Sequence, residues 1–317
     1  MKTGIKIFCI KVFLLLLPFI MLFSWIEFKA RDLPNSYALK KENFERLHDS
    51  VSILVLGSSH ALKGINPDFF SCTGFNFSNS SQSLSLDSWI CLKYLPQLPE
   101  LKAVVIDISC FSFYFDLKDS PEEWRNYFYY RYYGLPVPCR DLPDLRSFSR
   151  AALYTRGFLN DLVFNKLNVK EEFGDIQPNG WERTPSGGGG SSSLSNSGGR
   201  KRVILHQSLR DEKNFPFILH NLEELLSALE KRKIQVFFVS VPVYQTYSDF
   251  LDPANIRENH RILSHLCEMY PASYSDYTHD SRFHPEDFYD NDHLNSKGAE
   301  KFSRILDREI LEGICNP

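Results

Sequence analysis

The chain has 317 residues, of which 43% are hydrophobic and 24% charged, and its formal net charge is −3. A chain of this length and composition can bury a full core as one large domain. Its small negative charge gives no basic field, which excludes nucleic acid as an expected partner.

Residues 1–28 are expected to form a transmembrane signal anchor. Lys2, Lys6 and Lys11 precede the apolar run from Val12 to Ile26, which reaches about 20 residues, enough to cross a bilayer, if Ile7 to Ile10 are counted with it. No Ala-x-Ala-like site follows it, which favours an anchor over the alternative, a cleaved signal peptide. The lysines predict that the N-terminus lies inside, so that the rest of the chain is extracytoplasmic.

Residues 29–50 are polar and are expected to form a stalk with a short helix, and residues 51–317 one α/β domain. Short apolar runs predict strands of a parallel sheet, and apolar residues at helical spacing predict the helices between them. The expected strands are 53–56, a short one at Asn76, 103–108, 234–241 and 272–277. The expected helices are one that Ser83 or Ser85 caps and that runs through Leu95, and those at 221–233, 260–269 and 296–310.

A glycine and two serines follow the first of these strands, in the order Gly57-Ser58-Ser59. Ligands of open α/β sheets bind at the carboxyl ends of the strands, so these hydroxyl groups are suitably located for chemistry. Gly57 allows a sharp turn that would bring an amide close to a bound oxyanion. His60 comes next and is a candidate for tuning the site.

The strongest candidate base lies near the C-terminus, in an Asp-x-x-His arrangement of Asp290 and His293. Asp290 can orient the imidazole through one nitrogen while the other takes a proton from a serine. Asn295 or Ser296 is the expected N-cap of the following helix, which docks this loop at an edge of the sheet.

These two motifs together resemble the SGNH or GDSL superfamily of serine hydrolases and acyltransferases, in particular membrane-anchored proteins of polysaccharide O-acetylation. The resemblance implies a three-layer flavodoxin-like fold, with Ser59 as nucleophile, His293 as base and Asp290 as its partner. Ser58 falls on the Asp position of the family motif and is the alternative nucleophile, and Asp292 is the alternative acid. The resemblance covers roughly residues 50 to 312.

The family's oxyanion motifs are degenerate in this chain. The segment after the Asn76 strand has Asn79 but lacks the expected glycine, and the strand at 103–108 leads to Ser109 rather than to an asparagine. The oxyanion hole is then expected either to use the Ser59 amide with groups near Asn79 or to be incomplete, and the candidate oxyanion and substrate-binding residues are Gly57, Asn79 and Ser109. Tyr244, in a loop at the same sheet edge, either lines the pocket or packs in the core.

Two segments interrupt the α/β pattern. Residues 111–165 form an aromatic-rich insert, expected either as a lid or acceptor-binding wall, or as a subdomain that packs on the core or the bilayer. Residues from about 178 to 200 are rich in Gly and Ser and are expected to form a disordered loop. The cysteines are spaced without a Cys-x-x-Cys pair and give neither a connectivity nor a zinc site.

The expected function is a serine-dependent O-acyl esterase or transferase, with acetyl as the expected acyl group and a cell-surface glycan as substrate. No metal or organic cofactor is required. The membrane and an acyl-donor membrane protein are the other expected partners. The alternative is a catalytically inactive protein of this fold that acts in binding or assembly during envelope polysaccharide biosynthesis.

Overall fold

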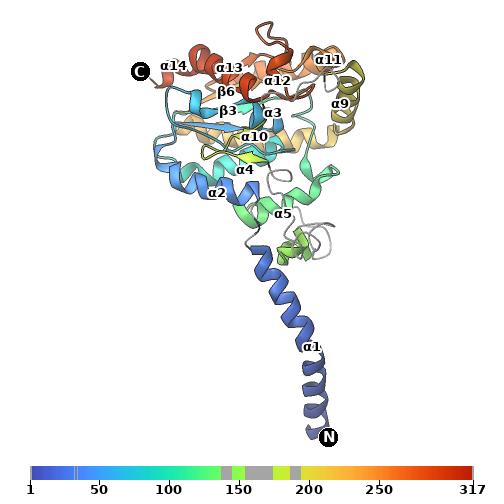
Figure 1. Ribbon diagram of the computed structural model, residues 1–317. Helices are drawn as coiled ribbons and strands as arrows, with labels where there is room; N and C mark the ends of the chain where they lie inside the picture. The colour runs from blue at the N-terminus through green and yellow to red at the C-terminus, as the bar shows by residue number, and fades with distance from the viewer. Residues whose placement is uncertain are drawn as a thin grey trace.

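The structure is a computed structural model that describes residues 2–31, 33, 35–136, 145–153, 174–185 and 194–315. A parallel sheet lies at its centre, with the strand order β2-β1-β3-β6-β7 (Figure 1). Numbered along the chain within this sheet, the order is 2-1-3-4-5, which is the flavodoxin-like order. The predicted α/β fold class with a parallel central sheet is confirmed. The strands are β1 (Ile53–Leu56), β2 (Gly74–Asn76), β3 (Ala103–Asp107), β6 (Gln235–Ser240) and β7 (Ala272–Asp276).

Helices surround this sheet, and a two-stranded antiparallel hairpin forms a separate small sheet. The hairpin consists of β4 (Asp175–Ile176) and β5 (Glu182–Arg183). The helices are α1 (Lys2–Arg31), α2 (Ser36–Leu47), α3 (Ser59–Gly64), α4 (Leu84–Tyr94), α5 (Asn126–Phe128), α6 (Leu145–Phe148), α9 (Asn196–Ser208), α10 (Phe215–Lys231), α11 (Gln245–Ser248), α12 (Pro253–Met269), α13 (Ser296–Leu306) and α14 (Glu312–Cys315).

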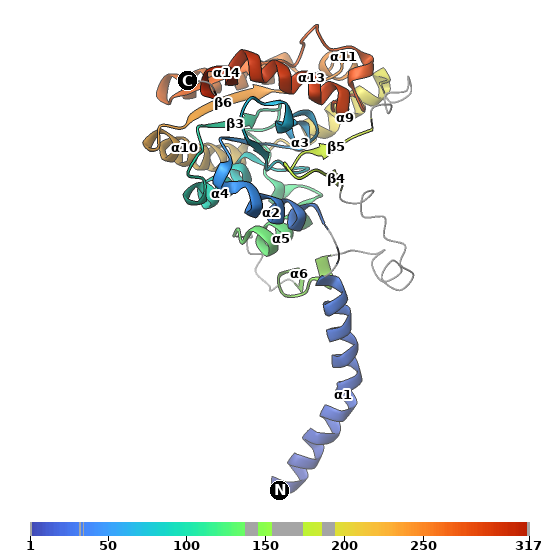
Figure 2. The ribbon, with the colours of Figure 1, turned by 60° about the vertical axis from the view of Figure 1, so that its left-hand side comes forward.

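The apolar runs of β1 and β3 are buried on both faces of the sheet, as central parallel strands require. Alternate residues point to opposite sides: Leu54 and Leu56 join the core formed with α4 and α10. Ile53 and Val55 join a second core with α3 and α13. This alternation produces three layers, with α13 on one side of the sheet and α4 and α10 on the other (Figure 2).

Helix α1 projects from the domain (Figure 1). Its residues Gly4–Arg31 have a mean hydropathy of 2.6, and none of its most apolar stretch is buried. A helix of this length and composition fits a membrane anchor or a signal sequence.

Helix α2 falls in the segment that was expected to be a stalk, but it packs on the domain. Tyr37, Lys40 and Phe44 lie on one face and are fully or almost fully buried. The ring of Phe44 contacts the rings of Phe75 and Phe77 at centroid distances of 5.3 and 5.0 Å. The segment is polar by composition, but the rings of Tyr37 and Phe44 on one face of α2 attach it to the domain.

The described part of the aromatic insert packs mainly inside the domain. Phe113, Phe128, Tyr129 and Tyr133 are almost fully buried, and Tyr37 of α2 contacts the last three of these rings. Core packing therefore accounts for most of these rings. Residues 137–144 and 154–165 of the insert lie outside the described residues.

The expected disordered loop at 178–200 is ordered at both of its ends. Residues 178–185 contain β5, held by hydrogen bonds from Asn179 to Asn66 (2.7 Å) and from Trp181 to the carbonyl of Lys63 (2.8 Å). Residues 194–200 contain the first turn of α9, and Ser195 is its N-cap. Polar side chains thus anchor both ends of a segment that is poor in apolar groups. Residues 186–193 lie outside the described residues.

Candidate active site

The turn after β1 brings the two serines to the carboxyl edge of the sheet. Gly57 has φ +142°, and a Cβ at this position would lie 2.5 Å from the Cβ of Asp107, so the turn requires glycine. Burial raises the pKa of the nearby Asp87 carboxyl to about 8, and the main-chain N–H of Gly57 acts weakly in the opposite direction. That the Gly57 amide serves an oxyanion stays a prediction.

Ser58 and Ser59 have different partners. Ser58 is the N-cap of α3, where its hydroxyl accepts from the N–H of His60 (3.4 Å) and donates to Asp107 Oδ2 (3.1 Å). Burial raises the pKa of Asp107. The hydroxyl of Ser59, the first residue of α3, instead lies 2.8 Å from His293 Nε2. The structure thus brings Ser59 to the imidazole and holds Ser58 in the helix cap.

His293 joins Ser59 to Asp290. Its Nδ1 lies 2.9 Å from both carboxylate oxygens of Asp290, which also accepts hydrogen bonds from the N–H groups of His293 (2.9 Å) and Asp292 (3.1 Å). With its proton on Nδ1, His293 donates to Asp290 and accepts from the Ser59 hydroxyl. The predicted N-cap Asn295 fixes this loop to α13 by accepting from the N–H groups of Lys297 and Gly298.

Asp292 occupies a separate buried position behind the imidazole. Its Oδ2 accepts from Arg202 Nε (2.8 Å) and lies 3.3 Å from His60 Nε2, while its Oδ1 is 3.7 Å from His293 Nδ1. Burial opposes ionisation, but the neighbouring imidazoles and the Arg202 guanidinium outweigh it and hold the pKa of Asp292 well below its usual range. Asp290 is therefore the closer acid.

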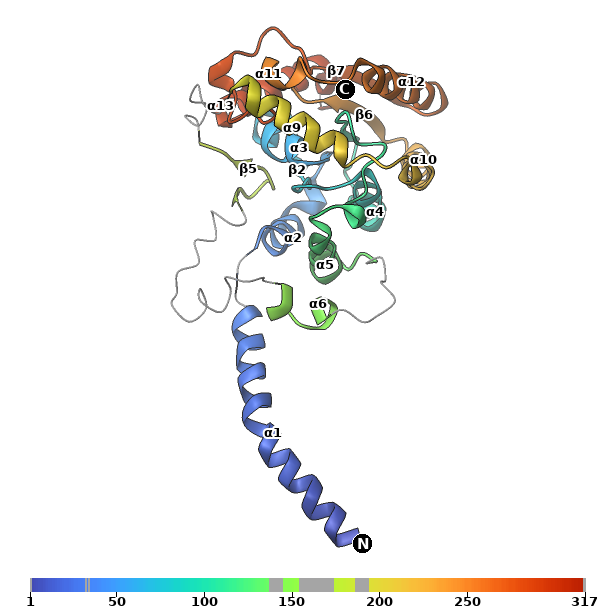
Figure 3. The same cartoon turned by 90° about the vertical axis from the view of Figure 1, so that its right-hand side faces the viewer.

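Sequence reasoning missed Arg202 and His206, which α9 brings to this network. Helix α9 lies against α11 (Figure 3), and its residues Arg202 and His206 line the pocket beside Ser59. Burial lowers the pKa of His206 to about 3, so its imidazole is neutral. The sequence carried no signal for them, because Arg202 reads as one residue of a solvated basic run and its partner lies 90 positions away.

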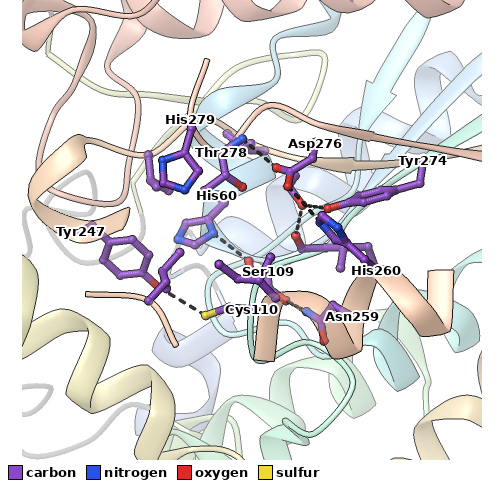
Figure 4. A pocket seen from close by; sticks show the side chains of 16 residues that line it. His60, Ser109, Cys110, Tyr247, Asn259, His260, Tyr274, Asp276, Thr278 and His279 are labelled. Atoms are coloured by element: carbon purple, nitrogen blue, oxygen red, sulfur yellow. Dashed lines mark hydrogen bonds and ion pairs between the residues drawn. The ribbon is translucent and has the colours of Figure 1, made fainter. Parts of the chain in front are cut away.

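The other predicted binding residues are not joined to Ser59 by any hydrogen bond in the described part of the chain. The Asn79 side chain donates to Gln82 Oε1 at 3.1 Å. The Ser109 hydroxyl lies 2.8 Å from His60 Nδ1. It lines a separate cavity that is smaller than the pocket beside Ser59 (Figure 4). Tyr244 packs edge-on against Phe288 at 5.3 Å, so the core-packing alternative is the observed one.

The pocket beside Ser59 has a volume of about 390 Å³ and two kinds of wall. Its apolar lining residues include Phe111, Phe115, Leu205 and Leu209. Its polar and charged lining residues include Lys63, Ser80, Ser81, Glu122 and Arg125, as well as Arg202 and His206 of α9. Ser59 and His293 lie in the same pocket, which can therefore hold an apolar group and a polar group near one hydroxyl.

His60, Asp292 and His293 are the one group of three potential metal ligands among the described residues, with ligand atoms within 4.8 Å of one another. The ligand atoms of this group already have protein partners. Asp292 contacts Arg202 and His60. His293 contacts Ser59 and Asp290. A cation would have to displace the Arg202 guanidinium, so the donor set does not fit a metal in this arrangement.

Comparisons with known proteins add little to this geometry. No family model matches the chain, and no curated protein matches it. One solved structure with a similar fold is that of a protein from Bacteroides fragilis to which acylhydrolase activity is attributed; it has 12% sequence identity and a TM-score of 0.41, over 88% of this chain and 95% of that chain. A likeness this remote supports no assignment, and membership of the SGNH superfamily stays a prediction.

Proposed function

We propose that this chain is a serine-dependent O-acyl esterase or O-acyltransferase with Ser59 as nucleophile, and that it acts on an extracytoplasmic cell-surface glycan. The observation that carries the proposal is the chain of hydrogen bonds from Ser59 through His293 to Asp290. A hydroxyl, a neutral imidazole and a carboxylate in this order form the arrangement that activates a serine for acyl transfer.

The reaction proceeds in two steps. His293 Nε2 takes the proton from Ser59 as its oxygen bonds to the ester carbonyl carbon, and then returns that proton to the leaving alcohol as the ester bond breaks. Asp290 stabilises the imidazolium and holds the proton on Nδ1. Water or a sugar hydroxyl then attacks the acyl-enzyme, again with its proton passing through His293. The main-chain N–H of Ser59 is the remaining candidate oxyanion donor.

The glycan substrate, the acetyl group and the membrane partners are the finer parts of the proposal. Helix α1 supports them, because an anchor would hold the site near envelope glycans and near a membrane protein that donates acyl groups. A specific observation favours a second candidate, an inactive binding or assembly protein. The Asn79 side chain, an expected oxyanion donor, already donates to Gln82 inside the fold.

Turnover separates the two candidates. The full-length chain in detergent should be labelled by a fluorophosphonate and should release p-nitrophenol from p-nitrophenyl acetate. Both signals should vanish in Ser59→Ala and His293→Ala, because each removes a reacting group, and should persist in the matched control Ser58→Ala. A folded wild type that neither labels nor hydrolyses would overturn the enzyme proposal and favour the binding protein.

A further inference from the structure

A second pocket, lined mainly by polar residues, adjoins the pocket beside Ser59. It has a volume of about 570 Å³, and Lys63, Ser80 and Arg125 line both pockets. We call this second pocket the side groove. Its volume is in the range of small-molecule binding sites, and the shared lining residues place it next to the pocket that holds Ser59.

Elements from distant parts of the sequence form the side groove. Ser36 comes from the start of α2, Lys63 from α3, and Tyr289 from the loop that precedes His293. The β4–β5 hairpin, which Figure 2 shows near α3, adds Asp175 and Glu182 to the lining. The hairpin contacts both α2 and α3.

The lining of the side groove is rich in hydrogen-bonding groups of both charge signs. Lys63 Nζ lies 3.8 Å from Glu182 and 5.6 Å from the centre of the Tyr289 ring. Arg125 Nε donates to Glu122 at 2.6 Å. The lining also holds Arg183, so three cations, Lys63, Arg125 and Arg183, lie with the carboxylates of Asp175 and Glu182. Glu122, beside Arg125, makes the two signs equal in number, so the groove has no surplus positive charge to select an anion. Ser36, Ser80 and Thr184 add hydroxyl groups to the lining.

This chemistry differs from that of the apolar residues in the pocket beside Ser59. The phenylalanine and leucine side chains of Phe111, Phe115, Leu205 and Leu209 offer no hydrogen bonds. Ser59 and His293, whose Oγ and Nε2 lie 2.8 Å apart, line the same pocket. An acyl group bound at Ser59 would pack on these apolar side chains, which leaves the polar side groove for the alcohol part of the ester.

We infer that the side groove binds the alcohol part of the substrate and that this part is a neutral, polyhydroxylated sugar chain. The inference rests on the proposed function. Closely spaced hydrogen-bond donors and acceptors can pair with the many hydroxyl groups of a sugar. The aromatic ring of Tyr289 offers a face on which a sugar ring can pack. Deacylation by a sugar hydroxyl would use the same groove, since the attacking alcohol occupies the place of the one that left.

Binding can be tested without turnover. The full-length Ser59→Ala variant in lipid nanodiscs is titrated with cellotetraose, chitotetraose and maltotetraose as neutral probes and with tetragalacturonate as the anionic one, by saturation-transfer NMR. At least one neutral tetrasaccharide should bind, and more tightly than tetragalacturonate. Adding Glu182→Ala should weaken this binding by about 10- to 150-fold, since a lost hydrogen bond to a charged group costs about 1.5–3 kcal/mol.

Glu300→Ala is the matched control, because Glu300 also pairs with a basic side chain, Arg304 at 3.0 Å, but lies on α13 outside the groove. It should leave binding unchanged. Glu182→Gln repeats the test if the alanine variant is unstable on heating. Absence of any tetrasaccharide binding, preference for tetragalacturonate, or equal binding by the Glu182 and Glu300 variants would overturn the inference. Hydrolysis of p-nitrophenyl acetate by the wild type would in each case still support the enzyme proposal, so the two failures are distinguishable.

Discussion

Asp290 and Asp292 both approach Nδ1 of His293, but they differ in their other contacts. Asp290 lies at 2.9 Å and a third of its side chain is exposed, whereas Asp292 lies at 3.7 Å and is buried against Arg202. The first geometry orients an imidazole. The second neutralises a cation inside the protein, and removing one partner of such a pair is costly.

Substitution by asparagine should separate these two roles. We expect Asp290→Asn to lower kcat for p-nitrophenyl acetate by up to about 10⁴-fold with little change in stability, because the amide favours the wrong imidazole tautomer. Asp292→Asn should lower the free energy of unfolding by about 2–4 kcal/mol. This is less than the full cost of breaking a buried ion pair, because the Arg202 side chain is 36% exposed and solvent screens its charge. Urea unfolding and kcat measure the two effects. A larger activity loss in a stable Asp292→Asn would make Asp292 the acid partner of His293.

Asp87 gives a prediction about pH, because burial raises the pKa of its carboxyl to about 8. Between the unfolded value of about 4 and this value, the native state keeps a proton that the unfolded chain releases. As pH rises through this window, the group therefore lowers the free energy of unfolding by about 1.4 kcal/mol per pH unit. The contribution of the Asp87 carboxyl to the free energy of unfolding is thus most favourable below pH 4 and least favourable above pH 8.

Asp87→Asn removes this dependence while keeping the shape of the side chain. The stability of the variant relative to the wild type should increase from pH 5 to pH 8, as measured by urea unfolding at each pH. Asp68→Asn, at an exposed position, should show a constant difference. A difference that is also constant for Asp87→Asn would mean that Asp87 is ionised in the folded protein.

At the scale of elements, the strands whose residues are all buried were predicted best, because each forms a continuous apolar run in the sequence. The strand at 53–56 matches β1 residue for residue, and the predicted strands 103–108 and 234–241 each exceed β3 and β6 by one or two residues. A central strand of a parallel sheet is apolar throughout, so its local composition is enough. The glycine and serines that end β1 mark the turn for the same local reason.

Elements that depend on distant partners were predicted less well. The packing of α2 needs the rings of Phe75, Phe77 and Phe128, and α9 begins in a segment whose composition is that of a linker. The site shows the same division. Ser59, His293 and Asp290 carry local motifs that could be found, whereas Arg202 and the side groove arise only when separate segments meet.

At the scale of the whole molecule, two features bear on the side of the membrane on which the domain lies. A disulfide joins Cys72, after α3, to Cys315 at the end of α14, across 243 positions of sequence. The sequence left this pairing open, and Cys139 lies outside the described residues. Disulfides persist in oxidising compartments and are rare in the cytosol. The lysines that precede the apolar part of α1 favour the same orientation, with the N-terminus inside.

The Cys72–Cys315 disulfide closes a long loop of the unfolded chain and would therefore stabilise an extracytoplasmic domain. A cytosolic domain would lack it, because the cytosol keeps thiols reduced. When the full-length chain is expressed in the inner membrane of a bacterial host, we expect acid-quenched alkylation and mass spectrometry to find Cys72 and Cys315 bridged. Proteinase K added to spheroplasts should then digest the domain and leave only the N-terminal residues protected.

Three results would discriminate the possible arrangements. A protected domain with reduced Cys72 and Cys315 would contradict the proposed topology, and with it a glycan substrate outside the cell. A bridged domain released without α1 would mean that the N-terminal segment is a cleaved signal, and the site would then lose its attachment to the membrane. A bridged, membrane-bound domain would keep Ser59 beside envelope glycans. The compartment therefore determines which hydroxyl compounds can reach the side groove, which the geometry of the site alone does not specify.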